Sequence, residues 1–296
     1  MAYFAVDESD VLSLVDEAVS HLSTGEGEAN WLALVDTAFD HEGRPLHWSG
    51  TSTRLYRRGR LEALNAFSPL LCPLSVNNSI ALKQELATLI RHASGRPMLS
   101  FLRSHQNAHE LAQRLQDVLD VQTSDGQAFV LRLADTRALP AMAAAFQPKH
   151  WARVTREIDR WMLVNRRAKL ENLPLPDKVA AADSDDRPIV LSDAELNQLL
   201  RLGEPDALTQ SLFENFPELL PKRHHADFYQ LMLEVCEFGS RHRVTAFPEL
   251  MSLAVAAAST DGKLLGQPGL AAWLDARAWP QGQFEDGLAN FMETAE

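Results

Sequence analysis

The strongest constraint on this fold is a change in hydrophobic pattern along the 296-residue chain. Before about residue 172, apolar residues at helical spacing alternate with short apolar runs that are typical of buried strands. The stretch 173–189 is rich in Pro, Ala and Asp and predicts a linker. Beyond it, the patterns are helical. The sequence therefore predicts a domain of helices and strands over residues 1–172 and an all-helical domain over residues 190–296.

The first domain is expected to be α+β or α/β, with a mixed sheet and flanking helices. Helical spacing predicts helices over residues 9–22, 60–67, 79–93, 109–118 and 136–146. Apolar runs predict strands over residues 30–36, 70–76, 97–102, 119–122 and 128–133. The residues Asp125-Gly126 predict a hairpin between the last two strands. Pro73 favours an edge position or an irregular end for the strand 70–76. Residues 151–170 alternate imperfectly, and Arg166-Arg167 predicts a turn between two further strands there.

The second domain is predicted to consist of successive helices. A possible capping box, Ser192 with Glu195, marks the start of the first one. Further helical patterns cover residues 206–215, 226–238, 248–258, 270–276 and 284–294.

Charge is distributed unevenly between the two parts. The net charge is −12, which argues against a nucleic-acid partner, because phosphate binding needs clustered Lys and Arg. Residues 1–170 carry 19 acidic and 19 basic side chains, whereas residues 171–296 carry 21 and 9. Such an asymmetry can steer a basic partner toward the C-terminal domain. The alternative interpretation is a solvated acidic surface that keeps the protein in solution.

Other features predict a soluble protein of the cytoplasm. The longest apolar stretch near the C-terminus, residues 250–258, is much too short to cross a membrane. The N-terminal residues lack the basic start and apolar core of a signal peptide. Cys72 and Cys236 lie far apart in apolar surroundings, which predicts buried free thiols and a reducing compartment.

A search for catalytic and metal-binding motifs favours a protein with no enzyme activity, no cofactor and no metal. Neither a Gly-rich phosphate loop nor a Gly-x-Ser-x-Gly elbow is present in the sequence. His105 and His109 are four residues apart and could meet on one face of a helix, but the residues between them lack the Glu of a zinc hydrolase. His224 and His225 are adjacent, so on a helix they point in different directions and cannot simply share one ion. The acidic cluster Asp183, Asp185 and Asp186 lacks the Gly and Glu of a calcium loop and suits a solvated linker. A cleft between the two domains could still hold an unrecognised active site.

The six tryptophans divide into core and surface candidates. Trp31, within an apolar strand, is expected in the core. Trp48 and Trp279 stand beside loops, and tryptophan anchors protein interfaces because it buries a large area and keeps one donor. We therefore regard Trp48 and Trp279 as possible partner-binding residues.

Five segments in order resemble the family known as domain of unknown function 4123. Trp31–Ala38 is similar to its opening strand, and Leu55–Gly59 and Ser68–Leu74 occupy the next two places. Met98–Ser104 resembles its third strand. The residues that match the last motif in register, within Asp125–Leu139, are Arg132, Asp135, Arg137 and Leu139. Ala134, Thr136 and Leu70 depart from the usual aromatic, Pro and Tyr of the pattern.

The resemblance spans about residues 30–150 and implies an adaptor or chaperone of bacterial type VI secretion. Such a protein binds a cognate effector in the cytoplasm and helps to load it onto the VgrG/PAAR spike. Effector and spike would then be the partners, and turnover would not be needed. The alternatives that remain open are an uncharacterised hydrolase or transferase with an interdomain cleft, and an immunity protein that neutralises a toxin.

The residues of the resemblance also have a physical interpretation of their own. They are Trp31, Asp36, Arg132, Asp135 and Arg137. An aspartate between a strand and a helix can cap backbone N–H groups, and a nearby arginine can pair with it. We therefore predict a structural role for these residues, and the family offers no catalytic residues to carry over.

Overall fold

The computed structural model describes residues 3–23, 29–40, 44–177, 188–277, 279–280 and 282–294. The chain divides into two compact units. The first unit is Val6–Arg201, and the second is Leu202–Glu296 together with Ala2–Ala5. The boundary between them falls inside one helix, α6 (Asp193–Asn215). The fold class is α+β, as the sequence predicts, with sheets in the N-terminal part and helices in the C-terminal part.

The first unit is built on a six-stranded sheet of order β2-β3-β1-β4-β7-β8. All five neighbouring pairs are antiparallel. Its strands are β1 (Asn30–Val35), β2 (Thr53–Arg54), β3 (Leu70–Pro73), β4 (Leu99–Ser104), β7 (Arg160–Val164) and β8 (Leu170–Asn172). Of the two alternatives expected for the strand with Pro73, the edge position is wrong, because the two-residue strand β2 pairs along its outer side. The other alternative agrees with the structure, because β3 ends at Pro73, opposite Leu32.

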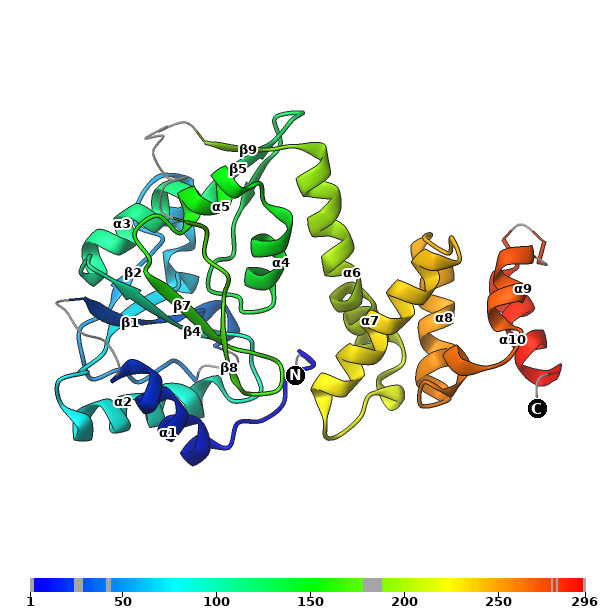
Figure 1. The fold of residues 1–296 in the computed structure, drawn as a ribbon, viewed down its shortest axis with the longest axis horizontal. Helices are drawn as coiled ribbons and strands as arrows, with labels where there is room; N and C mark the ends of the chain where they lie inside the picture. The colour runs from blue at the N-terminus through cyan, green and yellow to red at the C-terminus, as the bar shows by residue number, and fades with distance from the viewer. Residues whose placement is uncertain are drawn as a thin grey trace. The chain divides into compact units, whose positions relative to one another are not determined.

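Helices cover both faces of this sheet (Figure 1). The helices α1 (Val11–Leu22) and α2 (Ser79–Ala93) lie on one side, and α3 (Ala108–Leu119) and α5 (Pro148–Val154) lie on the other. Successive strand residues point to opposite faces. Both sets are apolar here, because Leu32 and Leu34 face one layer while Ala33 and Val35 face the other, and all four are buried. The near-continuous apolar runs of the sequence are therefore the consequence of a sheet covered on both sides.

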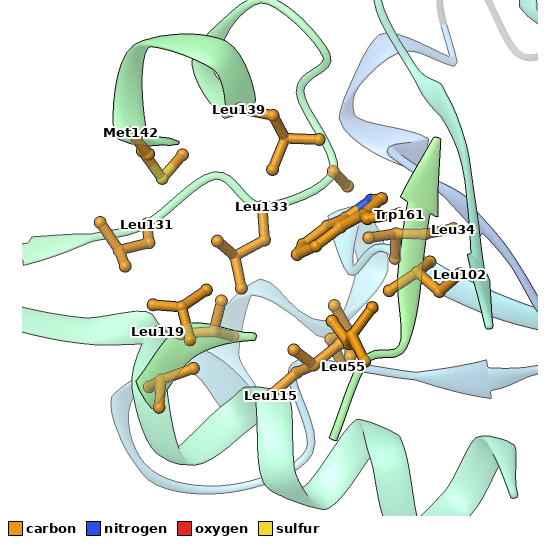
Figure 2. Close-up of a cluster of buried hydrophobic side chains, with 14 of the residues drawn as sticks. Leu34, Leu55, Leu102, Leu115, Leu119, Leu131, Leu133, Leu139, Met142 and Trp161 are labelled. Atoms are coloured by element: carbon orange, nitrogen blue, oxygen red, sulfur yellow. The ribbon is translucent and has the colours of Figure 1, made fainter. Parts of the chain in front are cut away.

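The larger core lies between the sheet and the helices α3, α4 (Ala138–Ala145) and α5 (Figure 2). Trp161 on β7 is fully buried at its centre, and its indole stacks on Trp151 of α5 with ring centroids 6.2 Å apart. The indole N–H donates to the buried Ser100 hydroxyl at 3.1 Å, which satisfies both polar groups. Core leucines from the sheet, from α3 and from the segment 131–139 surround the indole.

A second, three-stranded sheet of order β6-β5-β9 completes the first unit. The predicted Asp-Gly hairpin joins β5 (Asp120–Thr123) to β6 (Ala128–Val130). The strand β9 (Ile189–Leu191) pairs in parallel with β5. The expectation that strands end before the linker is therefore wrong, because two apolar side chains of β9, Ile189 and Leu191, are needed to cover the core. Residues 178–187 of the predicted linker lie outside the described residues.

The start of α6 is held within the first unit by a buried carboxylate, Glu195. The predicted capping box is present: the Ser192 N–H donates to Glu195 Oε2 at 2.9 Å, and the Glu195 N–H donates to the Ser192 hydroxyl at 3.3 Å. The Gln147 N–H and the His150 ring also contact Glu195 Oε1, at 2.8 and 2.7 Å. Burial tends to raise the pKa of Glu195, but these hydrogen bonds outweigh it and hold the pKa below its usual value.

The second unit consists of helices packed around its own core. Beyond the end of α6, its helices are α7 (His225–Arg241), α8 (Phe247–Ser259), α9 (Leu270–Ala276) and α10 (Phe284–Thr294), with the short 3-10 helices η5 (Pro217–Leu219) and η6 (Lys263–Gly266). The loop between α7 and α8 packs closely against α7 at Gly239. A Cβ atom at this position would lie only 2.9 Å from the Val244 carbonyl oxygen. Among the described residues, none of the helices is both long and apolar enough to span a membrane.

Both cysteines are free and buried, as the sequence predicts. Cys72 lies on β3 and Cys236 on α7. Burial raises the pKa of each thiol to about 12, so both stay protonated near neutral pH.

We expect that Trp161→Ala destabilises the first unit by about 3–5 kcal/mol, because it removes the largest fully buried side chain and leaves a cavity. Urea denaturation followed by circular dichroism measures the change. Leu12→Ala, at a position on α1 that is 79% exposed, is the control and should stay within about 0.5 kcal/mol of the unchanged protein.

We expect that Glu195→Gln lowers the free energy of unfolding by about 1.5–3 kcal/mol near neutral pH, because a charged acceptor is lost from a buried network. Since folding lowers the pKa of Glu195, its stabilisation is present above the pKa of the unfolded carboxyl and is lost as pH falls through the folded pKa. The two proteins should therefore converge in acid. Glu171→Gln, on the exposed face of β8, is the matched control. If Glu195→Gln lowers the free energy of unfolding equally at neutral and at acidic pH, Glu195 does not stabilise the fold as a charged acceptor.

Candidate functional site

Four of the five residues that carry the family resemblance meet at one end of β1, and Trp31 is the exception. Asp36 follows this strand directly, and Asp135 lies in the turn between β6 and α4. Together with Arg132 and Arg137 they form what we call the β1-end cluster. The backbone brings these segments together, because the Asp36 N–H donates to the Met98 carbonyl and the Thr136 N–H donates to the Pro97 carbonyl, both at 3.0 Å.

The four charged groups of the β1-end cluster are linked in a chain. Arg132 contacts both carboxylates, with Nη2 2.8 Å from Asp36 Oδ2 and Nη1 3.4 Å from Asp135 Oδ2. Arg137 binds Asp135 in a two-point contact, with Nη2 2.8 Å from Oδ2 and Nε 3.1 Å from Oδ1. The side chains of Asp36 and Asp135 are only 3% and 5% exposed, whereas that of Arg132 is 44% exposed.

Both aspartates also accept hydrogen bonds from the backbone, and the sequence predicts this for Asp135. Asp36 accepts from the Ala38 N–H at 3.0 Å and thereby caps the 3-10 helix η1 (Thr37–Phe39). Asp135 accepts from the Arg137 N–H at 3.0 Å, immediately before α4. Each carboxylate therefore closes a turn and pairs with an arginine at the same time.

The aromatic side chains Phe39 and Tyr56 border the cluster. The guanidinium carbons of Arg132 and Arg137 lie 4.8 and 5.3 Å from the centroid of the Phe39 ring, within the range of a cation–π contact. Burial raises the pKa of the Tyr56 hydroxyl, and the nearby Asp36 carboxylate raises it further, so this phenol stays protonated.

Electrostatics at Asp36 are a balance between burial and pairing. Burial raises the pKa of Asp36, whereas the Arg132 guanidinium and the Ala38 N–H lower it, and the net pKa is above its usual value. A general base needs a free lone pair directed at a substrate. Both oxygens of Asp36 and both oxygens of Asp135 already accept hydrogen bonds within the protein. This arrangement suits a structural clamp.

The three tryptophans singled out by the sequence lie in different surroundings. Trp31 on β1 is 4% exposed. Trp48 is half-buried, and its indole N–H donates to the Thr51 carbonyl at 3.1 Å. Trp279 is also half-buried and packs on Trp273, with ring centroids 4.6 Å apart. The structure does not bring these residues to the β1-end cluster, and partner binding by Trp48 and Trp279 stays a prediction.

A small polar hollow lies near the other end of β1. Its volume is about 310 Å³. The residues that line it are Leu22, Ala29, Asn30, Trp31, Leu74, Ser75, Val76, Asn77, Asn78 and Arg103. Two of its polar side chains already serve the fold, because Asn78 caps α2 and the Ser75 hydroxyl donates to Glu85 at 2.7 Å. Within the described part of the chain, no group of three or more His, Cys, Asp or Glu side chains is placed to hold a metal ion.

Comparison with known families gives one match. Residues 31–153 match the family described as Domain of unknown function (DUF4123). This part of the chain is a DUF4123 domain. The resemblance read from the sequence is thereby confirmed over nearly the same residues. Neither the curated proteins nor the solved structures include a match to the chain.

The DUF4123 match runs from β1 almost to the end of α5. It includes every member of the β1-end cluster and the Phe39 and Tyr56 rings beside it. It does not include β7, which contributes Trp161 to the same core, or Glu195, which holds the start of α6. The compact first unit is therefore larger than the matched family segment.

Sequence reasoning missed two contributors to the site, Phe39 and Tyr56. Each is an aromatic residue close in sequence to a motif residue, but only the folded chain shows that their rings border the arginines and Asp36. The histidine His150 was also missed, because its partner Glu195 is far away in the sequence.

We expect that Arg132→Ala destabilises the DUF4123 domain by about 2–3 kcal/mol near neutral pH, less than the 3–5 kcal/mol of a fully buried pair because Arg132 is 44% exposed. Loss of the guanidinium raises the pKa of Asp36 further, so the defect should shrink as pH falls and Asp36 takes up a proton. Lys83→Ala, which breaks an exposed pair with Asp16, is the control and should cost under about 1 kcal/mol. The measurement is urea denaturation of Arg132→Ala and the unchanged protein at neutral and at acidic pH. If the loss of unfolding free energy is the same at both, Arg132 does not act by stabilising a buried charge at Asp36.

Proposed function

We propose that this protein is a non-catalytic adaptor or chaperone of a bacterial type VI secretion system. It binds a cognate effector in the cytoplasm and helps to load that effector onto the VgrG/PAAR spike. Neither a cofactor nor turnover is needed for this task. The observation that carries the proposal is the DUF4123 domain over residues 31–153, because proteins that resemble this family act as such adaptors.

The geometry of the β1-end cluster is consistent with a role other than catalysis. Both oxygens of each carboxylate accept hydrogen bonds from arginine or backbone donors, and both side chains are buried, which suits a structural role. The Arg132–Asp36 contact fastens the turn before α4 to the end of β1. A rigid first unit with a clamped turn offers a stable surface, and preorganised surfaces lose less entropy on binding.

The charge of the second unit supports contact with a basic partner surface. Residues 202–296 carry 14 acidic and 6 basic side chains. On α7, Glu234 and Glu237 are exposed, and residues three apart share one face of a helix. An acidic face of this kind raises the rate of association with a basic partner and is sensitive to salt.

The test is co-expression of the full chain with each effector and VgrG/PAAR protein that sequencing finds encoded next to its gene. We expect at least one of them to co-purify with the chain, and deletion of the gene to stop secretion of the effector. If neither protein co-purifies and secretion continues, the adaptor role is wrong. If the gene instead protects a target cell from the toxin, the protein is an immunity protein.

The charge reversal Glu234→Lys with Glu237→Lys is expected to weaken binding of the basic partner by about tenfold at low salt, with a smaller effect at high salt. Glu171→Lys, on the first unit, is the charge control and should leave that affinity unchanged. The affinity can be measured by surface plasmon resonance at two salt concentrations. Equal affinity of the reversed and unchanged proteins would exclude α7 from the interface without touching the adaptor role.

A further inference from the structure

The first unit has a second surface whose chemistry differs from that of the acidic helical unit. It lies on the 3-10 helix η3 (Gly59–Phe67). Leu64 and Phe67 are 46% and 61% exposed there, although both are large apolar side chains. Arg54 and Arg57 are exposed in the chain just before η3. We call these four residues the η3 surface.

The geometry of η3 aligns its apolar side chains. In a 3-10 helix, residues three apart eclipse one another, so Leu61, Leu64 and Phe67 form one row. Leu61 is 2% exposed and belongs to the large core, so the row runs from the core to the surface. Runs of this helix beyond about 3–4 residues are uncommon, whereas η3 has 9 residues.

Hydrogen bonds fix η3 against the strand β2 and its surroundings. Arg54 Nη1 donates to the Asn65 carbonyl at 2.6 Å, and the Asn65 side chain donates to the Tyr56 carbonyl at 2.8 Å. The Ser68 hydroxyl, which is fully buried, accepts from the Tyr56 N–H at 2.7 Å. The exposed row is therefore held in place before any partner arrives, which lowers the entropic cost of binding.

The arginines around η3 differ in how their charges are balanced. Arg58 and Arg60 form ion pairs with Asp117 and Asp120. Arg54 instead bonds to a backbone carbonyl. Arg57 Nη1 lies 2.9 Å from His109 Nδ1. Each guanidinium has five N–H donors, so one such contact leaves most of them available to an acidic group.

We propose that the η3 surface binds a short segment of another protein in which apolar side chains stand beside Asp or Glu. The apolar row takes the apolar side chains, and Arg54 and Arg57 pair with the carboxylates. This inference rests on the proposed adaptor function, to which it adds a second partner-binding surface. The surface is opposite in charge to the acidic helical unit, so the two units suit different partners.

Two exposed apolar residues on other helices of the first unit serve as matched controls. Leu12 on α1 is 79% exposed and Ile80 on α2 is 71% exposed. The start of α1 lies at the end of α2, because the Ser9 N–H donates to the Ser94 hydroxyl at 2.9 Å. Leu12 therefore lies far along α2 from Ile80, and the two do not form one patch.

The probe is a short synthetic peptide that places Leu and Phe beside Glu, titrated with the full chain by fluorescence anisotropy. A second peptide has Lys in place of Glu, and a third has Ser in place of Leu and Phe. We expect the first peptide to bind at least about tenfold more tightly than either of the others, because both contacts are needed.

Variants of the chain locate the binding. Phe67→Ser and Arg57→Glu should each weaken binding of the first peptide by about tenfold, whereas Leu12→Ser and Ile80→Ser should leave it unchanged. Arg54→Gln keeps an N–H donor near the Asn65 carbonyl but removes the positive charge. It should weaken binding of the first peptide because the pairing with its Glu is lost. Glu62→Gln removes the acidic side chain on η3 itself and should tighten binding. Unaltered thermal midpoints show that each variant is folded.

Two results would overturn the inference. One is binding of the first peptide that Phe67→Ser does not weaken, or that Leu12→Ser weakens equally. The other is concentration-dependent self-association that Phe67→Ser abolishes, since a second copy of the chain would then occupy the surface. If the effector or the spike protein binds the chain but the first peptide does not bind at the η3 surface, only this inference is wrong. If the first peptide binds at the η3 surface while neither the effector nor the spike protein binds the chain, the adaptor function is wrong and the η3 surface is still a binding site.

Discussion

The first unit depends on the neutralisation of a buried carboxylate, Asp36, at the end of its central strand. A carboxylate that is 3% exposed needs a counter-charge and hydrogen-bond donors, because water no longer supplies them. Arg132 provides the charge from nearly a hundred residues further along the chain, and the Ala38 N–H provides a donor. The same arginine reaches Asp135, which begins the turn into α4. One ionic chain thus connects the sheet to the helical layer that covers the Trp161 core.

This role for the motif residues is consistent with the adaptor function that we propose, because the charged groups of the DUF4123 domain then serve the fold. The charges of the β1-end cluster are used inside the molecule, so the exposed features that remain for partners lie elsewhere. Among the described residues we single out two such features: the acidic helices of the second unit, and the apolar row of η3 with Arg54 and Arg57 in the chain just before it. An adaptor that holds an effector and a spike protein needs two such surfaces, and opposite charges would keep each partner on its own surface.

The success of sequence reasoning differed between kinds of element. The helix over residues 79–93 was predicted to the residue, because its apolar spacing and its end signals are local. The Asp-Gly hairpin was equally local. The position of β3 in the sheet was wrong, since Pro73 says nothing about whether another strand will pair beyond it. The strand β9 was missed, because three residues after a linker carry too little pattern and their partner β5 lies far away.

The sequence by itself determined the order of the helices and strands apart from β2, α5 and β9, the two apolar faces of the central strands, the acidic character of the C-terminal part and the family of residues 31–153. Those properties are written in spacing and composition, which need no knowledge of distant contacts. Tertiary structure alone decided that Arg132 joins Asp36 to Asp135, that Glu195 receives donors from Gln147 and His150, and that Leu64 and Phe67 stay exposed beside Arg54. The physical reason is that charge pairing and exposure depend on which segments meet in space.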